Sequence, residues 1–188
     1  MNNLCTSSFQ FHVEGAAACF RRPEFTEDFV SYDVMPPFVA RRMLNSLYLP
    51  DGAEWLVRYI EVLNPIRIKC ARINGSKGER RALVLENVAY VIGADLVIGA
   101  GGITNRHQLV ERAVAAQPNI HLGLASFPGT LRLLEEGNPS SASLNPMLHD
   151  LGWMLYEIRN PDTKLPSFFR AQLRNGRVDL SDDLLIAI

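Results

Sequence analysis

Hydrophobic and polar positions follow two different spacings along the chain, and each spacing predicts a type of element. Residues 9–13 alternate between apolar and polar side chains and predict a first strand. Residues 37–47 carry apolar side chains on one side at helical spacing, after a proline that suits the first position of a helix. A second helix is expected from a cap at Thr104 or Asn105 through about Ala116, because a proline follows.

Longer apolar runs predict the remaining strands of this part of the chain. These strands are expected over residues 55–72, 81–98 and 120–125, with a hairpin-like turn at 73–80. The expected order is therefore βαββαβ, that of the ferredoxin-like fold, in which both helices cover one face of an antiparallel sheet. RNA-recognition modules share this fold with many unrelated proteins, so the fold alone identifies no ligand.

The last third of the chain has a different pattern. Residues 151–158, 167–173 and 178–180 each resemble a short strand, and turn residues separate them. We therefore predict an α+β protein with two parts. A ferredoxin-like (RRM-like) domain is expected over residues 1–126, followed by a small C-terminal antiparallel β-sheet subdomain over residues 127–188.

Composition limits the classes of protein to consider. The chain has 188 residues, of which 47% are hydrophobic and 21% charged, as expected for one globular core. Its start has no basic region before an apolar one, and no apolar run is long enough to span a bilayer. Cys5, Cys19 and Cys70 are widely spaced and odd in number, which favours reduced thiols over a disulfide framework or a zinc site. We expect a cytoplasmic protein that does not enter a membrane.

A net charge of −1 argues against a protein coated with nucleic acid, but it is compatible with a local basic face. Residues 66–81 contain a cluster of bases in which Glu79 is the only acid. The bases of this cluster are Arg67, Lys69, Arg72, Lys77, Arg80 and Arg81. Arg41 and Arg42 are expected on the exposed side of the first helix. Both sets suit RNA phosphates, and the alternative for both is ordinary solvated surface charge.

Few residues indicate chemistry by themselves. No pair of carboxylates and no set of His, Cys and Asp has the spacing of an acid–base or metal site, so neither a metal nor a cofactor is expected. His107 is the candidate, because it follows Arg106 in the first turn of the second predicted helix. The positive end of a helix disfavours the imidazolium form, which leaves a neutral ring able to accept a proton. The alternative is a surface histidine that pairs with Glu111 one turn later.

Several motifs in the chain together resemble one family. They are SYDVMPPFVARRMLNSLYLP at 31–50, IEVLNPI at 60–66, LGWMLYE at 151–157 and FFRA at 168–171. These motifs closely resemble the CRISPR-associated Cas-five family (RAMP superfamily) in its type I-C branch. The resemblance extends over nearly the whole chain and implies a subunit that processes pre-crRNA.

In type I-C members the resemblance implies a metal-independent endoribonuclease that cuts the CRISPR repeat transcript. Its active residues are a tyrosine at the end of the first helix and a lysine–histidine pair at the start of the second. Tyr48 and His107 stand at the matching positions, and Arg106 replaces the lysine. Arginine can stabilise charge on a phosphate, but it cannot supply a proton as lysine can. The family's Cys-Arg-Glu after a Leu-Gly pair is also replaced here, by Leu-Ala-Ser after Gly123.

Three functions stay open at this point. The first is an enzyme that cleaves repeat hairpins by 2′-hydroxyl attack and then binds the crRNA 5′ handle. The second is a non-catalytic subunit that caps the 5′ handle in a type I Cascade surveillance complex, and the third is a small ferredoxin-like protein that binds a metabolite. The resemblance implies CRISPR repeat RNA and the Cascade backbone and large subunits as partners. The RNA contacts that we expect are Arg41, Arg42, Arg67, Lys69 and Arg72.

Overall fold

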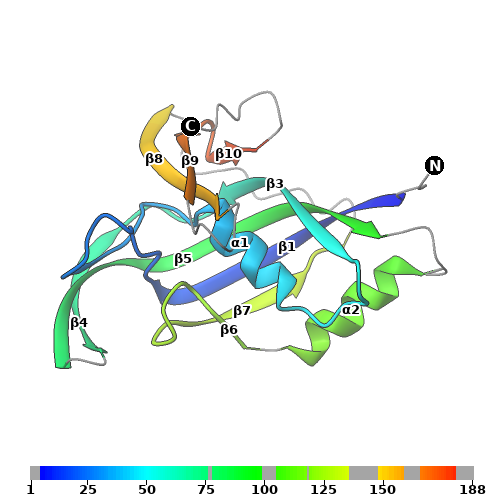
Figure 1. Cartoon of the computed structure of the whole chain (residues 1–188), viewed down its shortest axis with the longest axis horizontal. Coiled ribbons are helices and arrows are strands. Elements are labelled where there is room, and N and C mark those ends of the chain that lie inside the picture. Colours follow the sequence, from blue (N-terminus) through cyan, green and yellow to red (C-terminus); the bar gives the residue numbers. More distant parts are fainter. Residues whose placement is uncertain are drawn as a thin grey trace.

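The computed structural model describes residues 5–75, 78–98, 105–117, 119–135, 148–158 and 166–180. These residues form two helices and ten strands (Figure 1). The helices are α1 (Pro37–Asn45) and α2 (Arg106–Ala116). The strands are β1 (Cys5–Ala18), β2 (Phe29–Val30), β3 (Glu54–Val62), β4 (Ile68–Gly75), β5 (Gly78–Ile98), β6 (Ile120–His121), β7 (Pro128–Leu133), β8 (His149–Ile158), β9 (Pro166–Leu173) and β10 (Arg177–Asp179). Neither helix in the described ranges is long and apolar enough to cross a membrane.

Eight strands form one sheet around β5, the longest of them. The hydrogen-bonded order is β10–β3–β5–β1–β7–β6, and β2 and β4 also pair with β5. β1 runs antiparallel to β5 along almost its whole length, from Cys5 opposite Ile98 to Ala18 opposite Leu85. This long pairing agrees with the apolar run in β5, most of whose side chains are buried. The predicted α+β class, with mostly antiparallel strands and two helices, is confirmed.

Both helices begin where local sequence signals predict. α1 starts at Pro37, after Pro36 in an extended conformation. α2 is capped by Asn105, whose Oδ1 accepts a hydrogen bond from the backbone N–H of Gln108 at 3.0 Å. The C-terminal ends of the two helices lie side by side (Figure 1), and Gln117 Nε2 donates a hydrogen bond to Ser46 Oγ there at 2.9 Å.

The strand predicted over residues 55–72 is in fact two strands. β3 ends at Val62 and β4 begins at Ile68, with Pro65 between them. Proline has no backbone N–H to donate to a neighbouring strand, so it interrupts the pairing. β3 and β4 both pair antiparallel with β5, at successive parts of that strand. The predicted hairpin is confirmed by the β4–β5 pairing, and its tip at 76–77 lies outside the described residues.

The strand predicted over residues 120–125 is wrong beyond His121, where β6 ends. Gly123 has a φ of +88°, and a Cβ there would lie 1.9 Å from the backbone oxygen of Cys19. Only glycine fits this conformation and this close approach, so the chain turns here instead of continuing as a strand. The strand that pairs with β1 on this side is mainly β7, which begins seven residues after β6 ends.

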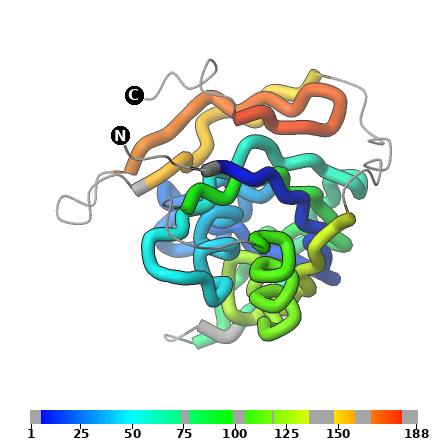
Figure 2. Tube along the Cα trace, turned by 90° about the vertical axis from the view of Figure 1, so that its right-hand side faces the viewer, coloured from blue at the N-terminus to red at the C-terminus, as the bar shows by residue number. Residues whose placement is uncertain are grey.

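Two strands from the predicted C-terminal part lie in the large sheet. β7 pairs with β1 and β10 pairs with β3, antiparallel in both cases. The strands predicted over 151–158 and 167–173 are confirmed as β8 and β9, which form a separate two-stranded antiparallel sheet. Figure 2 shows this pair, in yellow and orange, lying across one side of the remaining chain. Its buried side chains, among them Leu151, Met154 and Phe169, belong to the same hydrophobic core as the large sheet.

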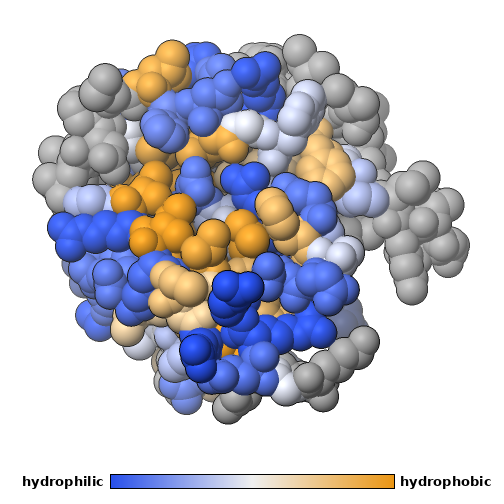
Figure 3. Space-filling model, turned by 90° about the vertical axis from the view of Figure 1, so that its left-hand side faces the viewer, coloured by the Kyte–Doolittle hydropathy of each residue, from blue (hydrophilic) through white to orange (hydrophobic). Residues whose placement is uncertain are grey.

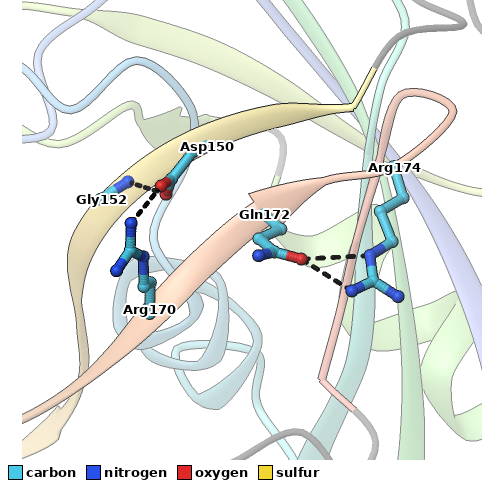
Figure 4. A network of polar contacts seen from close by, with 5 residues as sticks. All are labelled: Asp150, Gly152, Arg170, Gln172 and Arg174. Carbon is cyan, nitrogen blue, oxygen red and sulfur yellow. Dashed lines mark hydrogen bonds and ion pairs between the residues drawn. The ribbon is translucent and has the colours of Figure 1, made fainter.

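The other face of β8–β9 carries polar side chains. Asp150 accepts hydrogen bonds from the backbone N–H of Gly152 and from Arg170, and Gln172 accepts two from Arg174 (Figure 4). The hydrogen bond from Arg170 is the main reason why the pKa of Asp150 lies below its ordinary value. Both side chains of the Asp150–Arg170 pair are exposed, so the pair contributes little to stability.

Candidate active site

His107 lies at the surface in the first turn of α2, and its ring is oriented by the core. The ring packs against that of Phe9, with the centroids 6.1 Å apart. Phe9 in turn meets Trp55 edge-on at 5.7 Å, so the contact of His107 is with a fixed aromatic side chain. The alternative was a pairing of His107 with Glu111. Both residues are described, and no hydrogen bond or ion pair joins their side chains. His107 is therefore held in place on one side and open to solvent on the other.

Arg106 is half-buried, and its side chain points toward β1, the strand against which the His107 ring also packs. Its Nη1 donates to Ser7 Oγ at 3.2 Å. Ser7 and Phe9 are two residues apart in β1, so their side chains lie on one face of the strand, about 7 Å apart. The structure thus anchors Arg106 and His107 over neighbouring positions of β1, with a permanent cation beside an imidazole.

A hollow of about 310 Å³ opens beside His107. Its walls come from β1, β3 and β5, and His107 borders it from α2. Besides His107, the polar side chains that line it are Ser8, Gln10, Arg58, Tyr59, Asp95 and Glu135. These residues could not be predicted from the sequence, because they meet only through the strand register, with Ser8 opposite Asp95 and Gln10 opposite Gly93. The one sequence signal of this site is Gly93, an isolated glycine inside the apolar run of β5. A glycine within a strand often marks a position where another group approaches the backbone closely.

Tyr48 lies on an exposed segment and not in this hollow. It follows α1, its side chain is 92% exposed, and it does not line the hollow beside His107. The chain after Tyr48 enters β3, whose first residues pair with the end of β5 shortly before α2. The structure therefore brings Arg106 and His107 together and leaves the phenol of Tyr48 in solvent.

Comparison with known proteins identifies the family. The family model described as "CRISPR-associated protein (Cas_Cas5)" matches residues 9–180. The chain belongs to the CRISPR-associated Cas5 family. The resemblance inferred from the motifs at 31–50 and 151–157 is thereby confirmed.

Two curated Cas5 relatives are similar over most of the chain, and both carry the name "CRISPR pre-crRNA endoribonuclease Cas5d". The protein from Mannheimia succiniciproducens is 31% identical, across 91% of this chain and 93% of its own length. The protein from Thermus thermophilus is 28% identical, across 89% of each chain.

Two solved structures share the fold. One is described as the crystal structure of a CRISPR-associated protein, with a TM-score of 0.77, 21% identity, and coverage of 95% of this chain and 94% of the other. The second is a functionally uncharacterized protein from Streptococcus mutans, with a TM-score of 0.73, 20% identity and 95% coverage of both chains. The shared fold therefore extends over nearly all of the chain.

The prediction that Arg41 lies on the exposed side of the first helix is wrong. Its side chain is only 15% exposed and forms an ion pair with Glu157 at 3.1 Å. The guanidinium also lies 5.2 Å from the centroid of the Tyr156 ring, so Arg41 joins α1 to β8. Arg42 is exposed as predicted, and it borders a second hollow of about 510 Å³ between α1 and residues 119–125.

The bases predicted on the second strand lie in or beside β4 and do not share one face. Lys69 pairs with Glu86 at 2.9 Å, and Arg72 pairs with Glu79 at 3.3 Å. Because these two bases are three residues apart in a strand, their side chains point to opposite faces. Arg67 is exposed just before β4 begins. The three bases are all accessible, but they do not form one continuous phosphate-binding stripe.

The β4–β5 hairpin also exposes apolar side chains. Ile68 is 53% exposed and Leu83 is 44% exposed. Figure 3 shows the end of the molecule that carries this hairpin, where hydrophobic surface is surrounded by hydrophilic side chains. The local surface is therefore mixed, in agreement with the small net charge of the chain.

Proposed function

We propose that the chain is a metal-independent endoribonuclease that cuts CRISPR repeat RNA and stays bound to the 5′ handle of the resulting crRNA. The observation that carries this proposal is the 31% identity, over nine-tenths of both chains, to a protein named as a pre-crRNA endoribonuclease. The placement of His107 in the first turn of α2, beside a cation and a hollow, supports it.

The proposed chemistry uses the nucleophile that RNA carries itself. The 2′-hydroxyl gives its proton to the neutral imidazole of His107 and attacks the adjacent phosphorus. Arg106 stabilises the negative charge that develops on the non-bridging oxygens. The leaving 5′-oxygen takes a proton from water or from the Tyr48 phenol, which is free to approach the RNA because it is exposed. The products are a 2′,3′-cyclic phosphate and a 5′-hydroxyl.

We further infer that the large sheet and its two helices form a ferredoxin-like unit. The strand order β3–β5–β1–β7, with α1 between β1 and β3 and α2 between β5 and β7, supports this inference. Family membership supports assembly in the cytoplasm with the backbone and large subunits of a Cascade complex.

A second candidate function is that of a non-catalytic subunit that caps the 5′ handle. Two observations favour it. Arg106 stands where the family has a lysine, so this position cannot supply a proton. Tyr48 also lies outside the hollow that His107 borders.

The experiment that separates the two functions is incubation of the purified chain with end-labelled repeat RNA in EDTA. The proposal predicts one discrete cut at the base of the hairpin and retention of the 5′-handle fragment on the protein. Tight binding of the RNA without any cut would favour the capping function. Binding that shows neither a preference for the repeat nor a dependence on salt would exclude both RNA functions.

Arg106→Ala is expected to slow cleavage about a hundredfold, since removing one donor to a developing oxyanion typically costs 10²–10³ in rate. Arg106→Lys keeps the cation and is expected to stay within about tenfold of the original rate. The measurement is the single-turnover rate with saturating protein. An Arg106→Ala chain that cuts at the original rate would remove this residue from the site.

Arg42→Ala is expected to reduce the slope of log affinity against log salt by about one unit, because Arg42 is exposed and its loss removes one phosphate contact. Arg41→Ala is the matched control. Arg41 is the residue next to Arg42, and its guanidinium already pairs with Glu157. The control is expected to lower the melting temperature and leave the salt slope unchanged. Filter binding at several salt concentrations measures both slopes, and equal slopes for the Arg42→Ala and original chains would contradict the assignment.

A further inference from the structure

The hollow beside His107 has the size and the walls of a small binding site. Its volume of about 310 Å³ is at the lower end of the range for small-molecule pockets. The Tyr59 ring and a few polar groups form most of its wall, since Phe9 and Ala94, which also border it, are almost fully buried. A planar base is the part of an RNA that such walls accommodate.

Asp95 supplies a fixed pair of acceptor oxygens in this hollow. Oδ1 accepts from Ser8 Oγ and Oδ2 accepts from Arg58 Nε, both at 2.7 Å. Burial raises the pKa of Asp95, but the two hydrogen bonds and the charge of Arg58 together hold it below its ordinary value. Its side chain is 14% exposed, so an ionised carboxylate is held rigidly at the wall.

Tyr59 and Gln10 form a second fixed pair. Gln10 Nε2 donates to the Tyr59 hydroxyl at 2.7 Å, which leaves the amide oxygen of Gln10 as an acceptor. The Tyr59 ring lies directly on Gly93, where an added Cβ would stand 2.1 Å from a ring carbon. The guanidinium of Arg177, on β10, lies 3.9 Å from the centroid of the Tyr59 ring, so this ring is held in place.

We infer that this hollow holds the nucleobase of a nucleotide next to the scissile linkage, and that guanine is the base it fits best. The inference rests on the proposed function, in which His107 acts on the adjacent phosphate. His107 reaches the edge of the hollow, whose polar groups Ser8, Gln10 and Asp95 lie on the face of the sheet opposite to the Phe9 ring. The carboxylate of Asp95 and the amide oxygen of Gln10 are acceptors, and guanine alone presents two adjacent kinds of donor, N1–H and N2–H₂, on one edge. A phosphate suits the hollow poorly, because the carboxylates of Asp95 and Glu135 both line it.

The test is single-turnover cleavage, in EDTA, of repeat RNAs that carry each of the four bases at each nucleotide flanking the cut. Compensating changes in the paired strand keep the hairpin intact. Guanine at one of the two positions is expected to give a rate about tenfold above the other bases, the size of one good bidentate contact. Inosine, which lacks the 2-amino group, is expected to lose most of that advantage.

Asp95→Asn and Gln10→Leu are expected to reduce the preference for guanine, while Asp28→Asn, on the exposed loop before β2, keeps it. Melting curves identify any variant that fails to fold, and the base panel on the original chain needs no variant. Equal rates with all bases at both positions, or an unchanged preference in Asp95→Asn, would overturn the inference and leave the proposed function standing. A chain that cuts none of the RNAs would overturn both.

Discussion

His107→Ala is expected to reduce the rate of repeat RNA cleavage about a thousandfold, within the 10²–10⁴ that a general base contributes. The expected loss is large because His107 borders the hollow and sits beside a permanent cation, which the contact of Arg106 with Ser7 keeps in place. RNA affinity is expected to change little, since the ring is one contact beside several from the charged side chains of Arg and Lys. The measurement is a single-turnover rate together with a binding curve for each chain.

His149→Ala is the matched control for this prediction, because His149 is an exposed histidine on β8. It is expected to cleave at the original rate. Equal rates for the original and His107→Ala chains would show that another group takes the proton from the 2′-hydroxyl. A parallel loss of affinity and rate would assign His107 to binding instead of to chemistry.

Trp55→Ala is expected to lower the free energy of unfolding by about 3–5 kcal/mol, the usual cost of removing a buried aromatic side chain. Trp55 is 1% exposed and meets the rings of Phe9 and Phe11 edge-on at 5.7 Å and 5.2 Å. Its indole Nε1 donates to none of the described residues, so the loss comes from packing and not from a broken hydrogen bond. Since Phe9 supports His107, cleavage by the remaining folded protein is expected to fall as well.

The chain provides a matched control for this change in its other tryptophan, Trp153, which is 49% exposed on β8. Trp153→Ala is expected to change the free energy of unfolding by about 0.5 kcal/mol or less, as for most surface positions. Urea unfolding followed by circular dichroism compares the two variants. Equal destabilisation by both changes would contradict the packing that places Trp55 at the centre of the core.

Local signals predicted most of the elements, and long-range pairing accounts for the errors. Residues that cap a helix act within one turn, so the start of α2 after Asn105 could be predicted from the sequence. The turn at Gly123 depends on the backbone of Cys19, about a hundred residues earlier, and no local pattern contains that contact. The pairing of β7 with β1 likewise joins residues more than a hundred positions apart, and no strand was predicted over residues 128–133.

Some residues of the candidate site could likewise be predicted from local sequence, and others could not. The motifs identified Tyr48, Arg106 and His107 from their positions relative to the helices, and the structure confirms where those helices begin. The residues that line the hollow beside His107 were missed, because Ser8 and Asp95 become neighbours only when β1 pairs with β5. Helical spacing also could not show that Arg41 faces β8, since β8 begins more than a hundred residues later.

The most direct test of the proposed reaction is cleavage, in EDTA, of a repeat RNA with a single 2′-deoxy nucleotide on the 5′ side of the scissile phosphate. This change removes one hydroxyl and leaves the hairpin and every phosphate in place. The account predicts that the all-ribose RNA is cut to a 2′,3′-cyclic phosphate and a 5′-hydroxyl, while the deoxy RNA binds equally well and stays intact. Cleavage of the deoxy RNA at the same position, or no cleavage of either RNA, would contradict it.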